Sequence, residues 1–422
     1  TPAATASAAA TATPTATPAT AGAPTSAGAV QEAGVIYLIG SDDFLYRYDG
    51  ATGALDAVSG RAGFLDETTE GVLTVGRDGL LSFLRWDGTV GPGPCGLGTV
   101  LYTSRDGACL YREADDSVTF SVPGDATRQP LAPGWSIGGA TWDHSVTRVA
   151  FLRSLPGAVA EERAHNGLWV RERDGTLRQL YESDVATAFV TAPLWSPDGR
   201  SIAIFETPFM SSSIARDGTK LLLIDVATGA VTDLGTAFGL DWVSWSPAGE
   251  LTFVRGAGRE TWRDKRLVVR RPGGPERELA IPNAEHVQLA PVWSASGDLV
   301  FVAGPSDDTT VYDTTGYMDG TGTGDRRGMV LHADGSTTEV RCPEGVVEGI
   351  RPSADGRSFL LLCRAPGEGG YPLSLWLLGP GADAAVSLVR GLGLSADDAG
   401  GFGYYGKHPT LGTSTAWSLA PR

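Results

Sequence analysis

The chain has 422 residues, among them 57 glycines and 26 prolines, and 33 basic against 49 acidic residues give a formal net charge of −16. This charge argues against a nucleic-acid partner, because affinity for a phosphate backbone comes from lysine and arginine releasing counterions. No run of about 18 apolar residues occurs that would span a membrane as a helix.

The first 29 residues contain no charged, aromatic or branched aliphatic side chain. Such a segment cannot bury enough apolar surface to offset the entropy of ordering, so we predict a disordered Thr/Ala/Pro-rich tether over residues 1–33. The chain opens on Thr1 rather than methionine, which we interpret as a processed start. The tether is similar to the spacers of bacterial lipoproteins, so an N-terminal lipid anchor is the one membrane contact that we expect.

Residues 34–422 form the second predicted domain, and their pattern is that of strands and turns. Apolar residues alternate with polar ones, and Gly, Asp and Pro separate the runs. One unit, a short strand ending in Trp-Ser or a degenerate form of it, a tight turn and a buried strand, recurs at 139–153, 192–206, 242–256, 290–304 and 349–363. A second hairpin follows each copy, at 168–181, 221–234, 267–280, 329–342 and 375–388.

The spacing of these units predicts a β-propeller. Trp142, Trp195, Trp245 and Trp293 lie about fifty residues apart, close to the length of propeller repeats, about 40–50 residues. We therefore expect an all-β fold of four-stranded antiparallel blades. Weaker hairpins near the start of the domain bring the number to eight, while a single irregular blade over 59–131 would make seven. We expect residues 413–419 to supply the missing first strand and to close the ring.

The motif W-S-P-D-G-R-x-I-A, in its fullest form at 195–203, resembles the propeller repeats of TolB-like bacterial exported proteins. This WSPDG resemblance covers roughly residues 139–390. It implies a periplasmic or cell-surface interaction scaffold, often lipid-anchored, without chemistry of its own. TolB itself has six blades and an extra amino-terminal domain, so its role in the envelope complex is not carried over.

Four cysteines form two local pairs, Cys95 with Cys109 and Cys342 with Cys363. None has the C-x-x-C spacing of a zinc or redox site. In an exported protein we expect two disulfides, and four buried thiols are the alternative.

The most conspicuous repeated residues have structural explanations. Trp142, Trp195, Trp245, Trp293 and Trp417 could form a sugar-binding array, but their constant place before a turn favours packing between blades. We expect the aspartates of the turns, Asp198 and Asp355, to accept hydrogen bonds from nearby backbone N–H groups. No nucleophile with its base is apparent, so we predict no catalytic residue.

The connections between the second and third strands of the last five repeats are long: 154–167, 206–220, 256–265, 304–328 and 364–373. In a four-stranded meander all of them emerge on one face, and long loops in compact domains are usually functional or disordered. We predict that this face binds the ligand. Its candidate anchors are Phe209, Met210, Trp262, Tyr312, Tyr317 and Tyr371, with Tyr404 and Tyr405 from the connection at 400–412, where packing around the ring closure is the alternative.

The longest of these loops is rich in aspartate. Asp307, Asp308, Asp313, Asp319 and Asp325 could supply the oxygen ligands that Ca²⁺ prefers, although their spacing fits no EF-hand and solvated charge is the simpler interpretation. No other cofactor is expected.

We therefore predict an extracytoplasmic, monomeric, non-catalytic propeller that binds a protein or glycan ligand at the cell envelope. The alternative is a glycoside hydrolase or lyase with carboxylates in the central channel. A third hypothesis is a structural protein that spaces other envelope components.

Overall fold

The computed structural model describes part of the chain. The described residues are 20–21, 34–39, 44–67, 70–76, 81–91, 99–104, 108–113, 115, 117–122, 125–133, 136–154, 167–183, 188–190, 193–208, 218–257, 262–279, 286–306, 325–353, 355–364, 373–382, 384–392 and 415–418. They form strands and turns without a helix. No helix among them could therefore cross a membrane.

Four of the antiparallel sheets are simple and follow chain order. The first is β8 (Thr99–Thr103), β9 (Cys109–Arg112), β10 (Val118–Val122) and β11 (Asp125–Pro130). The second is β12 (Ser136–Trp142), β13 (Val149–Ser154), β14 (Gly167–Arg171) and β15 (Leu177–Glu182). The third is β24 (His286–Trp293), β25 (Leu299–Pro305), β26 (Arg327–Leu331) and β27 (Thr337–Val340). The fourth is β28 (Val346–Pro352), β29 (Phe359–Arg364), β30 (Leu373–Leu378) and β31 (Val386–Leu392), with β1 (Thr20–Ala21) added outside β31.

Two long strands each join two sheets. β4 (Ala54–Glu67) pairs with β3 (Phe44–Asp49) and with β5 (Gly71–Gly76), which is followed by β6 (Leu81–Arg85) and β7 (Val90–Gly91). β20 (Val231–Trp245) joins the sheet of β16 (Ala188–Val190), β17 (Leu194–Trp195), β18 (Ser201–Pro208) and β19 (Thr219–Asp225) to that of β21 (Leu251–Gly256), β22 (Lys265–Arg270) and β23 (Glu276–Glu278).

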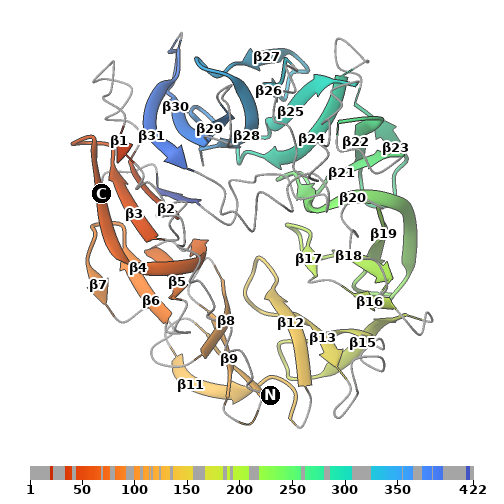
Figure 1. The fold of residues 1–422 in the computed structure, drawn as a ribbon. Coiled ribbons are helices and arrows are strands. Elements are labelled where there is room, and N and C mark those ends of the chain that lie inside the picture. Colours follow the sequence, from red (N-terminus) through yellow and green to blue (C-terminus); the bar gives the residue numbers. More distant parts are fainter. Residues whose placement is uncertain are drawn as a thin grey trace, which may run out of the picture.

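The sheets stand side by side around a central axis, which confirms the predicted β-propeller (Figure 1). The first strand of a sheet lies innermost and the fourth outermost, as β24 to β27 show clearly. If β4 and β20 are counted in both sheets that they join, the described strands form eight units. The blade count, eight or seven, stays a prediction.

The last strand closes the ring, as predicted. β32 (Thr415–Ser418) pairs antiparallel with β2 (Val35–Ile39), with Trp417 opposite Ile36. This pairing hydrogen-bonds the end of the chain to the first sheet and covers an otherwise open edge.

The core lies between neighbouring sheets. Ile202 and Ile204 of β18 pack against Leu168 and Val170 of β14, and all four are almost completely buried. Period-two alternation within a strand sends successive side chains to opposite faces, so each sheet contacts both of its neighbours.

The repeated tryptophans link neighbouring sheets, which confirms their predicted packing role. The indole nitrogen of Trp195 donates to the Thr141 carbonyl at 3.2 Å, and that of Trp245 donates to the Leu194 carbonyl at 3.3 Å. Each acceptor lies on the inner strand of the preceding sheet. Trp293 donates in the same way, at 2.9 Å, to a threonine hydroxyl of β21.

Trp142 reaches the preceding sheet through its ring, which meets Phe120 of β10 edge-on at 5.7 Å between centroids. The side chain of Trp417 lies outside the described residues.

The predicted pairing of Cys342 with Cys363 is confirmed, with the two Cα atoms 5.9 Å apart. Cys109 is also disulfide-bonded, and its expected partner Cys95 lies outside the described residues. The structure differs from the predicted disorder of the tether only at Thr20 and Ala21, which form β1; the rest of 1–33 lies outside the described residues.

Candidate ligand-binding face

One face of the propeller carries the connections between the second and third strands of the sheets, and we call it the loop face. In the order β12-β13-β14-β15 the chain leaves this face after β13 and returns to it at β14. The loops after β18, β21, β25 and β29 leave from equivalent strand ends. These strand ends form the base from which the predicted long loops start. The opposite face of the propeller carries the short turns, and we call it the turn face.

Glu206 lies at the loop-face end of β18, and only 5% of it is exposed. Its carboxylate accepts a hydrogen bond from the Tyr181 hydroxyl at the end of β15 and one from Lys220 Nζ at 3.2 Å. Burial raises the pKa of Glu206, but hydrogen bonds from Tyr181 and Ser183 and the charge of Lys220 outweigh it, so the pKa lies below its usual value. The ionised carboxylate therefore joins two sheets beneath the loop face.

A shallow hollow of about 270 Å³ opens where β21 and β22 meet the loop face, lined by Arg255, Gly256, Ala257, Asp264, Arg266 and Glu278. Arg255 Nη2 donates to the Leu234 carbonyl at 2.6 Å, and its Nη1 lies 2.7 Å from Glu276 Oε2. Arg266 Nη1 donates to the His286 carbonyl at 3.0 Å. Both guanidinium groups are thus held in place, and the mixed cationic and anionic lining suits a polar ligand.

Lys265 fixes the base of the loop beside this hollow. Although it is charged, only 1% of it is exposed. Its Nζ donates to the carbonyls of Ala257 at 2.7 Å and Arg263 at 3.0 Å, and lies 4.2 Å from the Phe238 ring centroid. The two ends of the connection between β21 and β22 are thereby tied to one buried ammonium group.

A buried cluster of charges lies between the β24–β27 and β28–β31 sheets. Glu348 is fully buried, and its Oε1 accepts hydrogen bonds of 2.6 Å from Arg326 Nη1 and from Arg364 Nε. The β28–β29 register shifts between Val347 and Gly349, so Glu348 is the extra residue of a β-bulge. Bulges redirect a side chain, and here the redirected carboxylate meets two arginines.

Trp262 does not lie on the surface as the sequence prediction required. It is 3% exposed and belongs to the core between the β20–β23 and β24–β27 sheets. Its ring lies 4.2 Å from the Arg326 guanidinium, and a Cβ on Gly304 would meet it at 2.7 Å. Its role as an exposed anchor is therefore corrected, because the ring fills space between sheets. The other predicted anchors lie outside the described residues and stay predictions: Phe209, Met210, Tyr312, Tyr317, Tyr371, Tyr404 and Tyr405.

Asp325 is the one predicted calcium ligand within the described residues. Its two carboxylate oxygens accept hydrogen bonds from Arg341, at 2.5 and 3.3 Å. The hydrogen bond from Arg341 holds the pKa of Asp325 below its usual range. Within the described ranges no three acidic, histidine or cysteine side chains are grouped as metal ligands. The remaining candidates, Asp307, Asp308, Asp313 and Asp319, lie outside those ranges.

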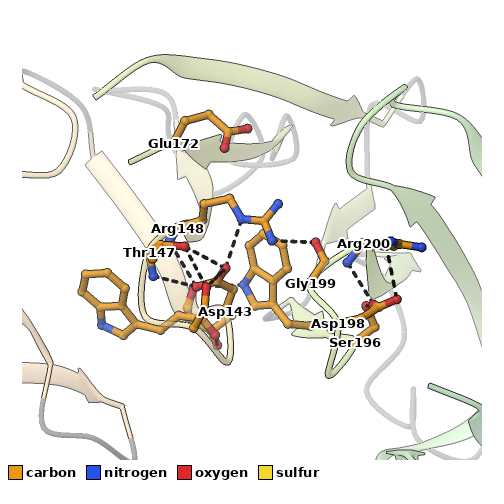
Figure 2. Close-up of polar contacts among 12 residues, drawn as sticks. Asp143, Thr147, Arg148, Glu172, Ser196, Asp198, Gly199 and Arg200 are labelled. Carbon is orange, nitrogen blue, oxygen red and sulfur yellow. Dashed lines mark hydrogen bonds and ion pairs between the residues drawn. The ribbon is translucent and has the colours of Figure 1, made fainter. Parts of the chain in front are cut away.

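On the turn face, Asp143 is the centre of a polar cluster that bridges two sheets (Figure 2). Its Oδ1 accepts from the backbone nitrogens of Thr147 at 2.8 Å and Arg148 at 3.1 Å, and its Oδ2 accepts from Arg148 Nε at 3.0 Å. Arg148 Nη2 then donates to the Gly199 carbonyl at 2.7 Å. Because these contacts occupy both carboxylate oxygens, we assign the cluster a structural role.

Sequence reasoning missed Asp143, although a signal existed. Aspartate follows Trp142 where serine follows Trp195, and an arginine ends both turns, at 148 and 200. That pattern indicates a second kind of turn, in which the carboxylate takes the place of the serine hydroxyl.

The turn aspartates behave as predicted. Asp198 Oδ1 accepts from Ser196 Oγ at 2.7 Å and from the Arg200 backbone nitrogen at 3.0 Å, as labelled residues in Figure 2 show. Asp355 accepts from Ser353 Oγ in the same arrangement. Gly199 has φ of 65°, a left-handed conformation that favours glycine.

No protein-family model and no curated protein matches the chain. Among solved structures, puromycin hydrolase is similar, with 16% identity and a TM-score of 0.49 over 78% of this chain and 53% of that one. TolB from Acinetobacter baumannii has 13% identity and a TM-score of 0.33 over 77% and 78%. Streptogramin B lyase has 14% identity and a TM-score of 0.38 over 77% and 92%. The chain spans about half the length of the puromycin hydrolase. Likenesses of this size carry no functional argument.

Proposed function

We propose that this protein is an extracytoplasmic, non-catalytic β-propeller that binds a protein or glycan ligand at the cell envelope through its loop face. The observation that carries the proposal is that the long connections of the last five repeats all start from strand ends on the loop face, whereas the turn face carries short turns. Beneath the loop face, charged side chains such as Glu206, Lys265 and Glu348 are buried and held by hydrogen bonds, which gives the long loops a rigid base. A base of this kind supports recognition, since binding residues commonly lie on loops carried by a rigid scaffold.

The hollow beside β21 and β22 supports a polar ligand. Arg255 and Arg266 are directly opposite each other in the ladder, and Asp264 and Glu278 lie next to them. Hydroxyl-rich glycans and polar peptides offer both donors and acceptors to such a lining.

The disulfides support an extracytoplasmic location. Cys342–Cys363 and the bond at Cys109 belong to the kind of cross-link that persists in oxidising compartments and is rare in the cytosol. We include a lipid anchor preceding the tether in the proposal, as the resemblance to lipoprotein spacers implies.

The test is a binding screen of the full chain against glycans and envelope proteins, repeated with a variant whose residues 307–324 are replaced by Gly-Gly. We expect at least a ten-fold loss of affinity for the captured ligand. The control variant is Arg200→Ala with Arg357→Ala, which removes two exposed side chains from the turn face and leaves the loop face intact.

Unchanged binding by the shortened variant, together with an unchanged melting temperature, would contradict the proposal. Release of cleaved glycan during the screen would instead support the alternative, a glycoside hydrolase or lyase.

A further inference from the structure

The outer edge of the β28–β31 sheet carries a strand from a distant part of the chain. β1, residues Thr20–Ala21, pairs antiparallel with β31, with Thr20 opposite Arg390 and Ala21 opposite Val389. β1 also contacts β4, the outer strand of the first sheet. Figure 1 shows β1 beside β31 and the first strands of the ring. β1 belongs to the predicted tether at residues 1–33, which we call the leader, and it lies across the seam where the last sheet meets the first.

The composition of the leader explains why a short strand forms at this point. Thr20 is β-branched and suits an extended backbone, and residues 1–29 themselves carry no charge. Pro18 and Pro24 flank the pair, and proline lacks the N–H that a ladder needs. The sequence thus limits strand pairing to the few residues between the two prolines.

The edge of β31 has room for this pairing. β31 extends over seven residues, Val386–Leu392, and β1 lies opposite two of them, Val389 and Arg390. An outer strand presents a row of outward N–H and C=O groups, which are a template for another extended segment. Recognition by strand addition depends on main-chain hydrogen bonds, so it accepts the small uncharged side chains of the leader.

We propose that the outer edge of β31 is a strand-addition site for an extended, uncharged Thr/Ala-rich segment, which the leader of the same molecule occupies as a latch across the propeller seam. This site is separate from the loop face and does not depend on the ligand proposed there. The pairing of β32 with β2 joins the two ends of the ring on the inside, and β1 adds a second link on the outside.

The geometry favours the leader of the same molecule over that of a second copy. β4 is two ladder positions from β2 through β3, a separation of roughly 10 Å. Twelve residues, 22–33, connect Ala21 to Gly34, and such a connection can reach roughly 40 Å. The chain is long enough to place β1 on its own β31.

The first test is amide hydrogen exchange on the full chain and on a Thr20→Pro, Ala21→Pro variant. Proline removes the donors of β1 without touching the propeller. We expect the outward-facing amides around Val389 and Arg390 to exchange at least ten-fold faster in the variant. In a control variant, Ala8→Pro with Ala9→Pro, the amides around Val389 and Arg390 should exchange at the same rate as in the original chain. Equal exchange in all three proteins would overturn the proposal.

The second test adds a synthetic peptide of residues 15–26 to the full-length proline variant. We expect binding that restores slow exchange, and at least ten-fold weaker binding to the unmodified chain, whose edge is occupied. The same peptide carrying the Thr20→Pro and Ala21→Pro substitutions should not bind. Absence of binding to the variant would contradict a strand-addition site. A dimer of the original chain that the proline substitutions dissociate would show occupation by a second copy, and would overturn the intramolecular latch.

Discussion

Cys363, in the second strand of its sheet, forms a disulfide with Cys342 of the preceding repeat. Two other sheets make a polar contact from the same position of their second strand. Cys363 lies five residues after Ser358, whose carbonyl closes the turn before β29. Glu206 and Arg255 lie equally far after the corresponding residues of their own turns, and they bond to Tyr181 and to Leu234. In all three cases the side chain reaches the last strand of the preceding sheet, or the residues just after it. One position of the repeat therefore links neighbouring sheets by three kinds of bond.

Removal of the disulfide should destabilise the propeller. For the double variant Cys342→Ser, Cys363→Ser we expect a loss of roughly 3 kcal/mol, because the bond closes a loop with a sequence separation of 21 and restricts the unfolded chain. The measurement is the midpoint of denaturant unfolding. An unchanged midpoint would show that hydrogen bonds alone hold this junction.

The buried carboxylate of Glu348 should matter far more than an exposed one. Glu348→Gln leaves Arg326 and Arg364 beside a neutral group in a buried site, so we expect a loss of about 3 kcal/mol in the free energy of unfolding. The matched control is Glu344→Gln, whose ion pair with Arg390 is about half exposed. That change should cost less than about 1 kcal/mol. Equal effects of the two substitutions would refute the structural importance of the buried cluster.

Acid should weaken the bridge between the β12–β13 and β17–β18 turns. Burial raises the pKa of Asp143, but hydrogen bonds from Arg148, Thr147 and Ser145 outweigh it and leave the pKa below its usual value. The folded pKa is thus below the unfolded one, about 3.9. Stabilisation by this carboxylate is complete above that value and is lost as the pH falls through the folded pKa.

The variant Asp143→Asn tests this dependence. Its free energy of unfolding should be lower than that of the original chain near neutral pH, and the difference should shrink below about pH 4. Denaturant titrations between about pH 3 and about pH 7 measure it. If the free energies of unfolding of the two proteins differed by the same amount at every pH in that range, Asp143 would not contribute through its charge.

Lys265 should control the order of the loop between β21 and β22. Lys265→Met keeps a side chain of similar length beside Phe238 but removes the donors to Ala257 and Arg263, so we expect roughly ten-fold faster tryptic cleavage in this loop. Limited proteolysis followed by mass spectrometry measures the rate. Lys220→Met is the control, since that side chain is 42% exposed and lies on β19. Similar cleavage in both variants would argue against the anchoring role.

The sequence by itself determined the features that depend on neighbouring residues. Period-two alternation, the glycine and aspartate of each turn, and the repeated tryptophan predicted the strands, the hairpins, the capping by Asp198 and the packing between sheets. The closing strand could be predicted from the phase of the repeats, and the pairing of Cys342 with Cys363 from their closeness in the sequence of an exported protein. The signals for the strands and turns are local, since each hairpin contains its own turn chemistry and its own buried strand.

Only the tertiary structure decided which side chains meet between sheets. A one-residue bulge in β28 turns Glu348 toward two arginines, and no local pattern reports a bulge of this kind. Trp262 lies in a predicted surface loop, yet its ring fills the space beside Gly304. Thr20 and Ala21 come from a segment with no core-forming residue, and they pair because an edge of β31 is available. These contacts depend on register and on the identity of the neighbouring sheet, which the folded ring determines.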